Sequence, residues 1–126
     1  MAELNEKLLG DLLRIKAEQK PDFDVLTFEH LSLDGGATPD EVRTYSDLAT
    51  NANQIAAALI SQGLDKGGRF GLMMRNHPEY VESMGAASMT GSVFVPIDPR
   101  TQGEKLAYFL QNSECKGLIC ADYCMQ

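Results

Sequence analysis

The spacing of apolar residues changes along the chain, and each change predicts a different element. Leucines and an isoleucine recur at helical spacing over residues 3–19, where Leu4, Leu8, Leu12 and Ile15 form one stripe. Pro21 is expected to end this helix because proline cannot continue it. Residues 25–33 and 42–45 then predict two short strands, which can pair as an antiparallel hairpin across the Asp34-Gly35-Gly36 turn.

A second helix is predicted to follow this hairpin. Thr44 or Ser46 can cap its start, and Thr44 with Asp47 has the spacing of a capping box. Its apolar residues fall on one face, and its many alanines allow a close approach to a sheet. Gly63 is expected to stop it.

From residue 69 onward the pattern alternates strand, helix, strand, helix, strand. The strands are predicted at residues 70–74, 93–97 and 118–121, and the helices at residues 77–90 and 103–113. This order favours right-handed βαβ units and a mainly parallel sheet flanked by helices. The predicted fold class is therefore α/β, βαβαβ from residue 69, with a preceding helix and a short β-hairpin, in a single domain spanning residues 1–126.

In the part of the chain after residue 69, local features also predict where one helix begins and ends and how far one strand is buried. Asn76 is expected to cap the helix that follows, with Pro78 in its first turn. Gly91 is expected to end that helix in the left-handed conformation. Residues 93–97 form an apolar run that predicts a strand covered on both faces, which Pro96 and Pro99 force out of the sheet.

Charge and composition exclude several partners. Asp and Glu total 18 against 11 Lys and Arg, a formal net charge of −7, and no basic cluster is present. Nucleic acid and anionic membrane surfaces are therefore not expected partners. No apolar run approaches the roughly 20 residues of a membrane helix, and the charged N-terminus does not resemble a secretion signal. A cytoplasmic location is expected.

Cysteine and histidine placement predicts no metal site. Cys115, Cys120 and Cys124 match no common zinc spacing, and His30 and His77 lie far away in sequence. We expect reduced thiols, with Cys120 as a small buried apolar residue.

No catalytic residue is predicted. The chain has no GxxxxGK[ST] or GxGxxG phosphate loop and no GxSxG elbow. Gly67-Gly68 precedes a strand and predicts a tight loop. His77 lies at a predicted helix start, where we expect a solvated neighbour of the cap more than a catalytic base. His30 is expected on the polar face of its strand. Met73, Met74, Met84 and Met89 are expected to fill the core, although methionines also suit an adaptable ligand surface.

Asp98 is the most interesting carboxylate, because it directly follows the strand at residues 93–97. At the carboxyl end of a parallel strand it could touch a ligand. It is also placed to cap its own turn, which we favour. Arg100 could bind an anion there. Asp122 ends the last strand and allows the same two interpretations.

Four segments resemble, in order and spacing, the class I adenylate-forming enzymes, which include acyl-CoA synthetases, luciferases and nonribosomal adenylation domains. The resemblance covers roughly residues 40–122. The segments are RTYSDL, NQIAAALISQGLDKGGRFGLMM, RNHPEYVESMGAASMTGSVFVPIDPR and GEKLAYFLQNSECKGLICAD. One departure is Gly68, which stands where the family usually has Asp.

Membership would imply an N-terminal fragment of an acid–CoA ligase that uses ATP, Mg²⁺ and coenzyme A. The family's phosphate loop, ribose-binding Asp and C-terminal Lys would lie downstream, so no cofactor-binding residue is assigned and the fragment alone is expected to be inactive. The remainder of the parent is the expected partner, and apolar strands at residues 93–97 and 118–121 predict self-association. The motif wording is closest to synthetases for fatty acids or small carnitine-like acids. The alternative is a stand-alone α/β binding or protein-interaction module.

Overall fold

The computed structural model describes residues 3–32 and 34–125. Its elements are α1 (Leu9–Gln19), β1 (Asp24–Phe28), β2 (Glu41–Thr44), α2 (Tyr45–Ser61), β3 (Arg69–Met73), α3 (Pro78–Thr90), β4 (Val93–Pro96), α4 (Gly103–Asn112), β5 (Cys115–Cys120) and the 3₁₀ helix η1 (Asp122–Met125). The first helix begins later than expected. The first strand ends at Phe28, and Leu33, which was expected in it, lies outside the described residues.

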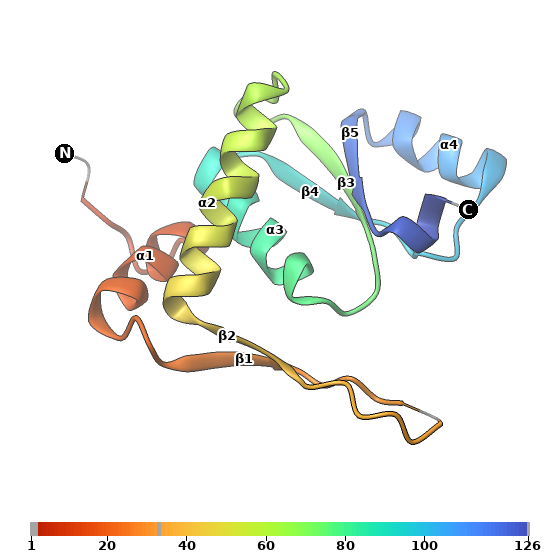
Figure 1. Cartoon of the computed structure of the whole chain (residues 1–126). Coiled ribbons are helices and arrows are strands. Elements are labelled where there is room, and N and C mark those ends of the chain that lie inside the picture. The colour runs from red at the N-terminus through yellow and green to blue at the C-terminus, as the bar shows by residue number, and fades with distance from the viewer. Residues whose placement is uncertain (1–2, 33, 126) are drawn as a thin grey trace.

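The second half forms a parallel sheet in the order β4-β3-β5, which confirms the α/β prediction. Phe70 of β3 lies opposite Phe94 of β4 on one side and Gly117 of β5 on the other. Figure 1 shows α2 and α3 on one side of this sheet and α4 on the other. Because β4 and β5 flank β3, the two crossovers run in opposite directions across the sheet and place α3 and α4 on opposite faces.

The central strand is β3, and the core centres on it. Phe70 and Leu72 are buried within a cluster that also holds Met74 and Ala87. The expectation that strand 93–97 is covered on both faces is wrong. Val93 is 47% exposed and Phe94 is only partly buried, because β4 is an outer strand that pairs with β3 alone.

A second cluster joins α1, α2 and α3. Leu13, Leu48 and Ala52 are buried in it. The small residues of α3 permit this close packing, as expected: a side chain at Gly85 would lie 2.8 Å from Leu13 Cδ1 and 3.2 Å from Ala52 Cβ. Helix α1 therefore packs against α2 and α3.

The caps at the start of α2 and at the end of α3 are as predicted from the sequence, whereas the predicted cap at the start of α3 is wrong. Thr44 caps α2 in a capping box, since its Oγ1 accepts from Asp47 N–H at 3.1 Å and Asp47 accepts from Thr44 N–H at 2.9 Å. Gly91 ends α3 with φ of 69°. The expected cap at Asn76 is wrong: the N-cap residue is His77, and its side chain makes no capping hydrogen bond.

An ion-pair network fastens the hairpin formed by β1 and β2 to the helices. Arg43 Nε donates to Glu82 Oε1 at 3.2 Å, and Asn51 donates to the same oxygen at 3.1 Å. Glu82 is 4% exposed. Partial burial opposes the charge of Arg43, but hydrogen bonds to Glu82 and Glu41 outweigh it and raise the pKa of this guanidinium.

Ser83 lies beside this network and provides a test of the packing. Its Oγ is buried and finds no partner among the described residues. Because an unpaired buried hydroxyl costs free energy, Ser83→Ala is expected to leave the free energy of unfolding unchanged or to raise it by about 1 kcal/mol. Urea denaturation measures this, and a loss above about 1 kcal/mol would reveal a partner that the structure does not contain.

Candidate site at the carboxyl edge of the sheet

The carboxyl ends of β3, β4 and β5 lie at one edge of the parallel sheet, where α/β proteins commonly bind ligands. Three loops follow these strands. They carry Arg75 and His77 after β3, Asp98 and Arg100 after β4, and Tyr123 after β5. This edge is the candidate functional site.

Asp98 closes its own turn, as favoured from the sequence. Its Oδ1 accepts from Arg100 N–H at 2.8 Å and from Arg100 Nε at 3.0 Å, while Oδ2 accepts from Arg100 Nη2 at 2.7 Å. Both side chains are exposed. Arg100 is therefore paired with Asp98 in this structure.

This pairing has a measurable consequence for titration. The Arg100 side chain, and then its backbone N–H, hold the pKa of Asp98 well below its ordinary value. Because the folded pKa is lowered, the pairing stabilises the fold above the unfolded pKa and is lost as pH falls through the folded one. Arg100→Ala is expected to raise the pKa of Asp98, and NMR titration of the carboxyl group measures this pKa. Lys105→Ala, which removes a weaker favourable charge, should raise the pKa of Asp98 less, and an equal rise would contradict the assignment.

A second group joins the loops after β3 and β5. Tyr123 Oη accepts from Arg75 N–H at 2.6 Å and shares a 2.9 Å hydrogen bond with His77 Nε2. The Arg75 guanidinium lies 5.0 Å from the centre of the Tyr123 ring. His77 is thus neither a solvated cap neighbour nor a free base, because its Nε2 is held by a tyrosine.

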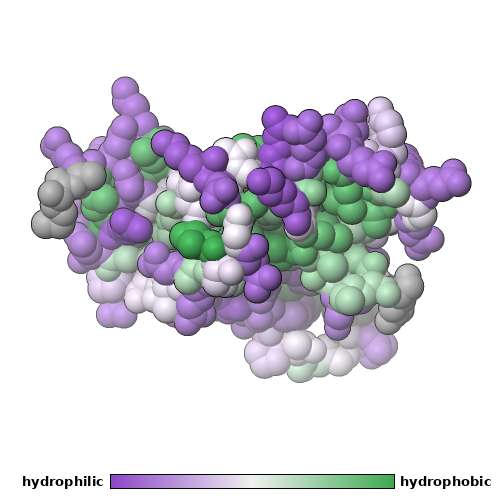
Figure 2. All heavy atoms as spheres, turned by 90° about the horizontal axis from the view of Figure 1, so that it is seen from above, coloured by the Kyte–Doolittle hydropathy of each residue, from purple (hydrophilic) through white to green (hydrophobic). Residues whose placement is uncertain are grey.

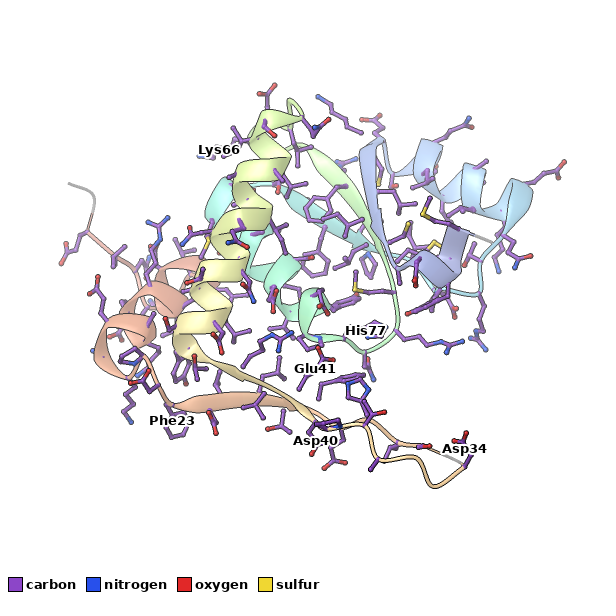
Figure 3. The ribbon with its side chains drawn as sticks, viewed as in Figure 1. Phe23, Asp34, Asp40, Glu41, Lys66 and His77 are labelled. Carbon is purple, nitrogen blue, oxygen red and sulfur yellow. The ribbon has the colours of Figure 1, made fainter. Side chains whose placement is uncertain are left out.

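Aromatic contacts continue from this group to the hairpin. The rings of His77 and Phe28 have centroids 5.4 Å apart, and Phe28 meets His30 edge-on at 5.0 Å. His30 Nε2 lies 3.0 Å from Glu41 Oε2. We expected His30 on the polar face of the first strand, but β1 ends at Phe28, two residues before it. Figure 3 shows Asp34 at the outer tip of the hairpin, away from His77. The hairpin therefore packs beside the candidate site.

The remaining sequence candidates have structural roles. Asp122 Oδ1 accepts from Tyr123 N–H at 2.8 Å at the start of η1. Gly67, with φ of 82°, forms the expected tight loop and donates to Gly91 O at 2.7 Å. Met73 and Met74 are buried in the core, while Met84 and Met89 are partly buried.

The three cysteines are free thiols that differ in their surroundings. Cys115 Sγ lies 3.1 Å from Ser113 Oγ, and Cys124 Sγ donates weakly to Met73 O at 3.5 Å. Cys120 is only partly buried. Within residues 3–32 and 34–125, no three or more His, Cys, Asp and Glu side chains are grouped so that they could hold a metal ion.

An open hollow of about 720 Å³ adjoins this edge. It runs between β4 and α4, where Val95, Ile97 and Phe109 supply apolar walls and Arg100 and Lys105 supply positive charge. Lys105 Nζ lies 5.8 Å from the centre of the Phe109 ring. Asp98 also lines the hollow and pairs with Arg100, so Lys105 is the cation of the lining that no carboxylate there pairs with.

Sequence reasoning missed Arg75 and Tyr123. Both follow strands at the same edge as Asp98, so the rule that singled out Asp98 could have found them had it been applied to all three strands. Sequence reasoning also missed the contact between Phe28 and His77. These residues lie 49 positions apart in the sequence, and no local pattern predicts that a hairpin residue contacts the start of a distant helix.

Comparison with known proteins links the chain to one family. The family model described as "AMP-binding enzyme" matches residues 13–126. The human mitochondrial medium-chain acyl-CoA ligase ACSF2 is 30% identical over 117 residues, which are 92% of this chain and 18% of that protein. The acyl-CoA ligase sidI of Aspergillus fumigatus is 31% identical over 111 residues, 88% of this chain and 18% of its own length. The chain therefore spans less than a fifth of these ligases.

Solved structures show the same fold. A fatty acid AMP ligase from Legionella pneumophila superposes with a TM-score of 0.78 at 23% identity, over 95% of this chain and 21% of its own. The N-terminal subdomain of NpsA from Klebsiella oxytoca gives a TM-score of 0.73, also at 23% identity, over 91% of this chain and 28% of its own. Among the described residues, no helix is long and apolar enough to cross a bilayer.

Proposed function

Because the chain belongs to the AMP-binding enzyme family, whose model matches residues 13–126, we propose that it is the N-terminal scaffold portion of an ATP-dependent acid–CoA ligase. The observation that supports this most is the 30–31% identity to two acyl-CoA ligases over about nine-tenths of the chain. Bacitracin synthase 1 of Bacillus licheniformis is 35% identical, but over only 66% of the chain. Tyrocidine synthase 1 of Brevibacillus parabrevis is 31% identical over 87% of the chain, so coverage does not separate the two classes, and the exchange experiment below decides between them.

The parent reaction has two steps. A carboxylic acid attacks the α-phosphate of ATP and forms an acyl-adenylate and pyrophosphate. Coenzyme A, as its thiolate, then displaces AMP and yields the acyl-CoA. Mg²⁺ would neutralise phosphate charge. The described residues of this chain offer no clustered ligands for such an ion.

The role that we assign to residues 1–126 is structural. They supply part of a parallel sheet, and its carboxyl edge is held by the Asp98–Arg100 pair and by the Tyr123 hydrogen bonds to His77 and Arg75. The rest of the parent would be the partner and would bring the ATP and coenzyme A sites. These side chains already hydrogen-bond to one another, which suits a wall of the site more than its reactive centre.

We further propose a fatty acid as the acyl substrate and a cytoplasmic location. Support for the substrate class comes from the ligase relatives, one of which is named for medium-chain acids. Support for the compartment comes from three cysteines without a disulfide, which suits a reducing environment.

Acid-dependent ATP–pyrophosphate exchange by the parent protein tests the proposal. The parent is expected to exchange label only when a carboxylic acid is present, and to form acyl-CoA when coenzyme A is added. A panel of fatty acids of increasing chain length, with amino acids as a matched set, identifies the substrate class. Exchange with amino acids but with no fatty acid would contradict a CoA ligase and favour a peptide synthetase.

A further inference from the structure

The tip of the hairpin, between β1 and β2, contains a pair of residues that can react with each other. Asp34-Gly35 is the only place in the sequence where an aspartate or asparagine precedes a glycine. Residues 34–40 are all exposed, and the tip projects from the lower right of Figure 1, where Figure 3 labels Asp34. It lies away from the upper face of the molecule, on which Figure 2 shows apolar atoms reaching the surface between hydrophilic side chains. The residues of the tip and water therefore determine its chemistry.

The nitrogen of Gly35 is unshielded. A bond from this nitrogen to Cγ of Asp34 closes a five-membered succinimide ring. Gly35 has φ of 74°, and no atom lies within 4 Å of the position that a Cβ there would occupy. Among residues 3–32 and 34–125, no backbone acceptor binds its N–H. Because glycine has no Cβ of its own, neither a side chain nor a backbone hydrogen bond protects the nitrogen from approaching the carboxyl group.

One contact at the tip opposes this ring closure. Ser32 Oγ donates to Asp34 Oδ1 at 2.6 Å and accepts from Gly36 N–H at 3.2 Å. The hydroxyl therefore holds the carboxylate in place and fixes the backbone on the far side of Gly35. The hydrogen bond from Ser32 is also the main cause that lowers the pKa of Asp34 below its ordinary value. An ionised carboxylate reacts poorly with a nitrogen because its oxygen cannot leave as water.

We propose that Asp34-Gly35 is a site of spontaneous isomerisation to isoaspartate, and that Ser32 slows this reaction in the folded chain. The Gly35 nitrogen attacks Cγ of the protonated Asp34 side chain, the bond from Cγ to the hydroxyl oxygen breaks, and the amide proton leaves with that hydroxyl as water. Water then opens the ring. Attack at the main-chain carbonyl carbon leaves Gly35 bonded to Cγ, which is isoaspartate, whereas attack at Cγ regenerates aspartate. One water leaves and one returns, so the reaction needs no oxidant or cofactor.

The product gives the tip a group that the original chain lacks. In isoaspartate the main chain runs through Cβ and Cγ, and the free carboxylate lies directly on Cα. Enzymes that methylate isoaspartate transfer a methyl group from S-adenosylmethionine to that carboxylate and release S-adenosylhomocysteine. The aged chain, but not the fresh one, is therefore expected to accept a methyl group from such an enzyme. Neither the isomerisation nor the methylation uses the proposed ligase activity.

Digestion with an endoproteinase that cleaves before aspartate but not before isoaspartate measures the reaction. The folded chain is aged in neutral buffer for increasing times, then unfolded and digested. We expect cleavage before Asp34 to fall with time and a second peptide of equal mass to appear. Asp40 is the matched control, because it is exposed in the same loop but precedes Glu41, whose side chain shields the nitrogen. Cleavage before Asp40 should persist.

Two variants test the roles of the neighbouring residues. Ser32→Ala is expected to speed the loss of cleavage about threefold, the factor that one hydrogen bond of ordinary net strength is worth. Gly35→Ala is expected to slow it about tenfold, because a Cβ shields the nitrogen and disfavours a positive φ. Both positions are exposed, so neither change removes core packing.

Three results would overturn the proposal. Equal losses at Asp34 and Asp40 would show that the glycine has no special effect. If cleavage before Asp34 stays constant in the folded chain while the chain unfolded in urea isomerises there, the folded turn prevents ring closure. An unchanged or slower reaction in Ser32→Ala would show that Ser32 does not restrain the carboxyl group.

Discussion

Phe70→Ala is expected to lower the free energy of unfolding by about 3–5 kcal/mol. Phe70 is 1% exposed on the central strand β3 and packs with Leu72, Met74 and Ala87 in the core. Neighbouring strands hold β3 on both sides, so the surrounding structure cannot collapse fully into the cavity that alanine leaves. Chemical denaturation measures the loss.

Phe94→Ala is the matched control, because Phe94 lies opposite Phe70 in the register but on the outer strand. It is only partly buried, so we expect a loss of no more than about 2 kcal/mol. Equal losses at the two positions would show that β4 is as enclosed as β3, in conflict with the strand order described above.

Glu82→Ala is expected to cost about 3–5 kcal/mol, since it removes one partner of a buried ion pair. The change removes the buried carboxylate to which Arg43 Nε donates at 3.2 Å, so that the guanidinium keeps only Glu41 and Glu79, and it leaves the Asn51 amide without its acceptor. Because Arg43 lies in the hairpin and Glu82 in α3, loss of the pair should also loosen the hairpin. Thermal unfolding and hydrogen exchange of β1 and β2 report these two effects.

Two further variants separate this pair from its neighbours. Glu79 lies 3.9 Å from the same guanidinium but is largely exposed, so Glu79→Ala should cost less than about 1 kcal/mol. Replacing both Arg43 and Glu82 by apolar residues of similar size should recover much of the stability that Glu82→Ala loses. A loss at Glu79 as large as that at Glu82 would contradict the buried network.

Local pattern was sufficient to predict most of the elements. The change from hairpin to alternating strands and helices predicted the parallel sheet, Thr44 and Asp47 predicted the start of α2, and Gly91 predicted the end of α3. These features depend on residues close in sequence, so spacing alone carries the information.

Strand order and long-range contacts were less accessible to sequence reasoning. Residues 93–97 are the more apolar run, yet β3 is the central strand, because order in a sheet depends on which way each crossover turns. The pairs Arg43–Glu82 and His77–Tyr123 join segments 39 and 46 positions apart. Neither pair has a local signature, so sequence reasoning could reach the candidate edge only through the rule that residues following parallel strands meet there, which it applied to Asp98, Arg100 and Asp122.

The central claim is that residues 1–126 form a scaffold of an adenylate-forming ligase and do not by themselves activate a carboxylic acid. Pyrophosphate release by the isolated chain, incubated with ATP, Mg²⁺, a fatty acid panel and coenzyme A, tests this most directly. The expected release equals that of a protein-free blank for every acid. Acid-dependent release above the blank, proportional to the amount of chain, would contradict the claim and would place a working ATP site within these residues.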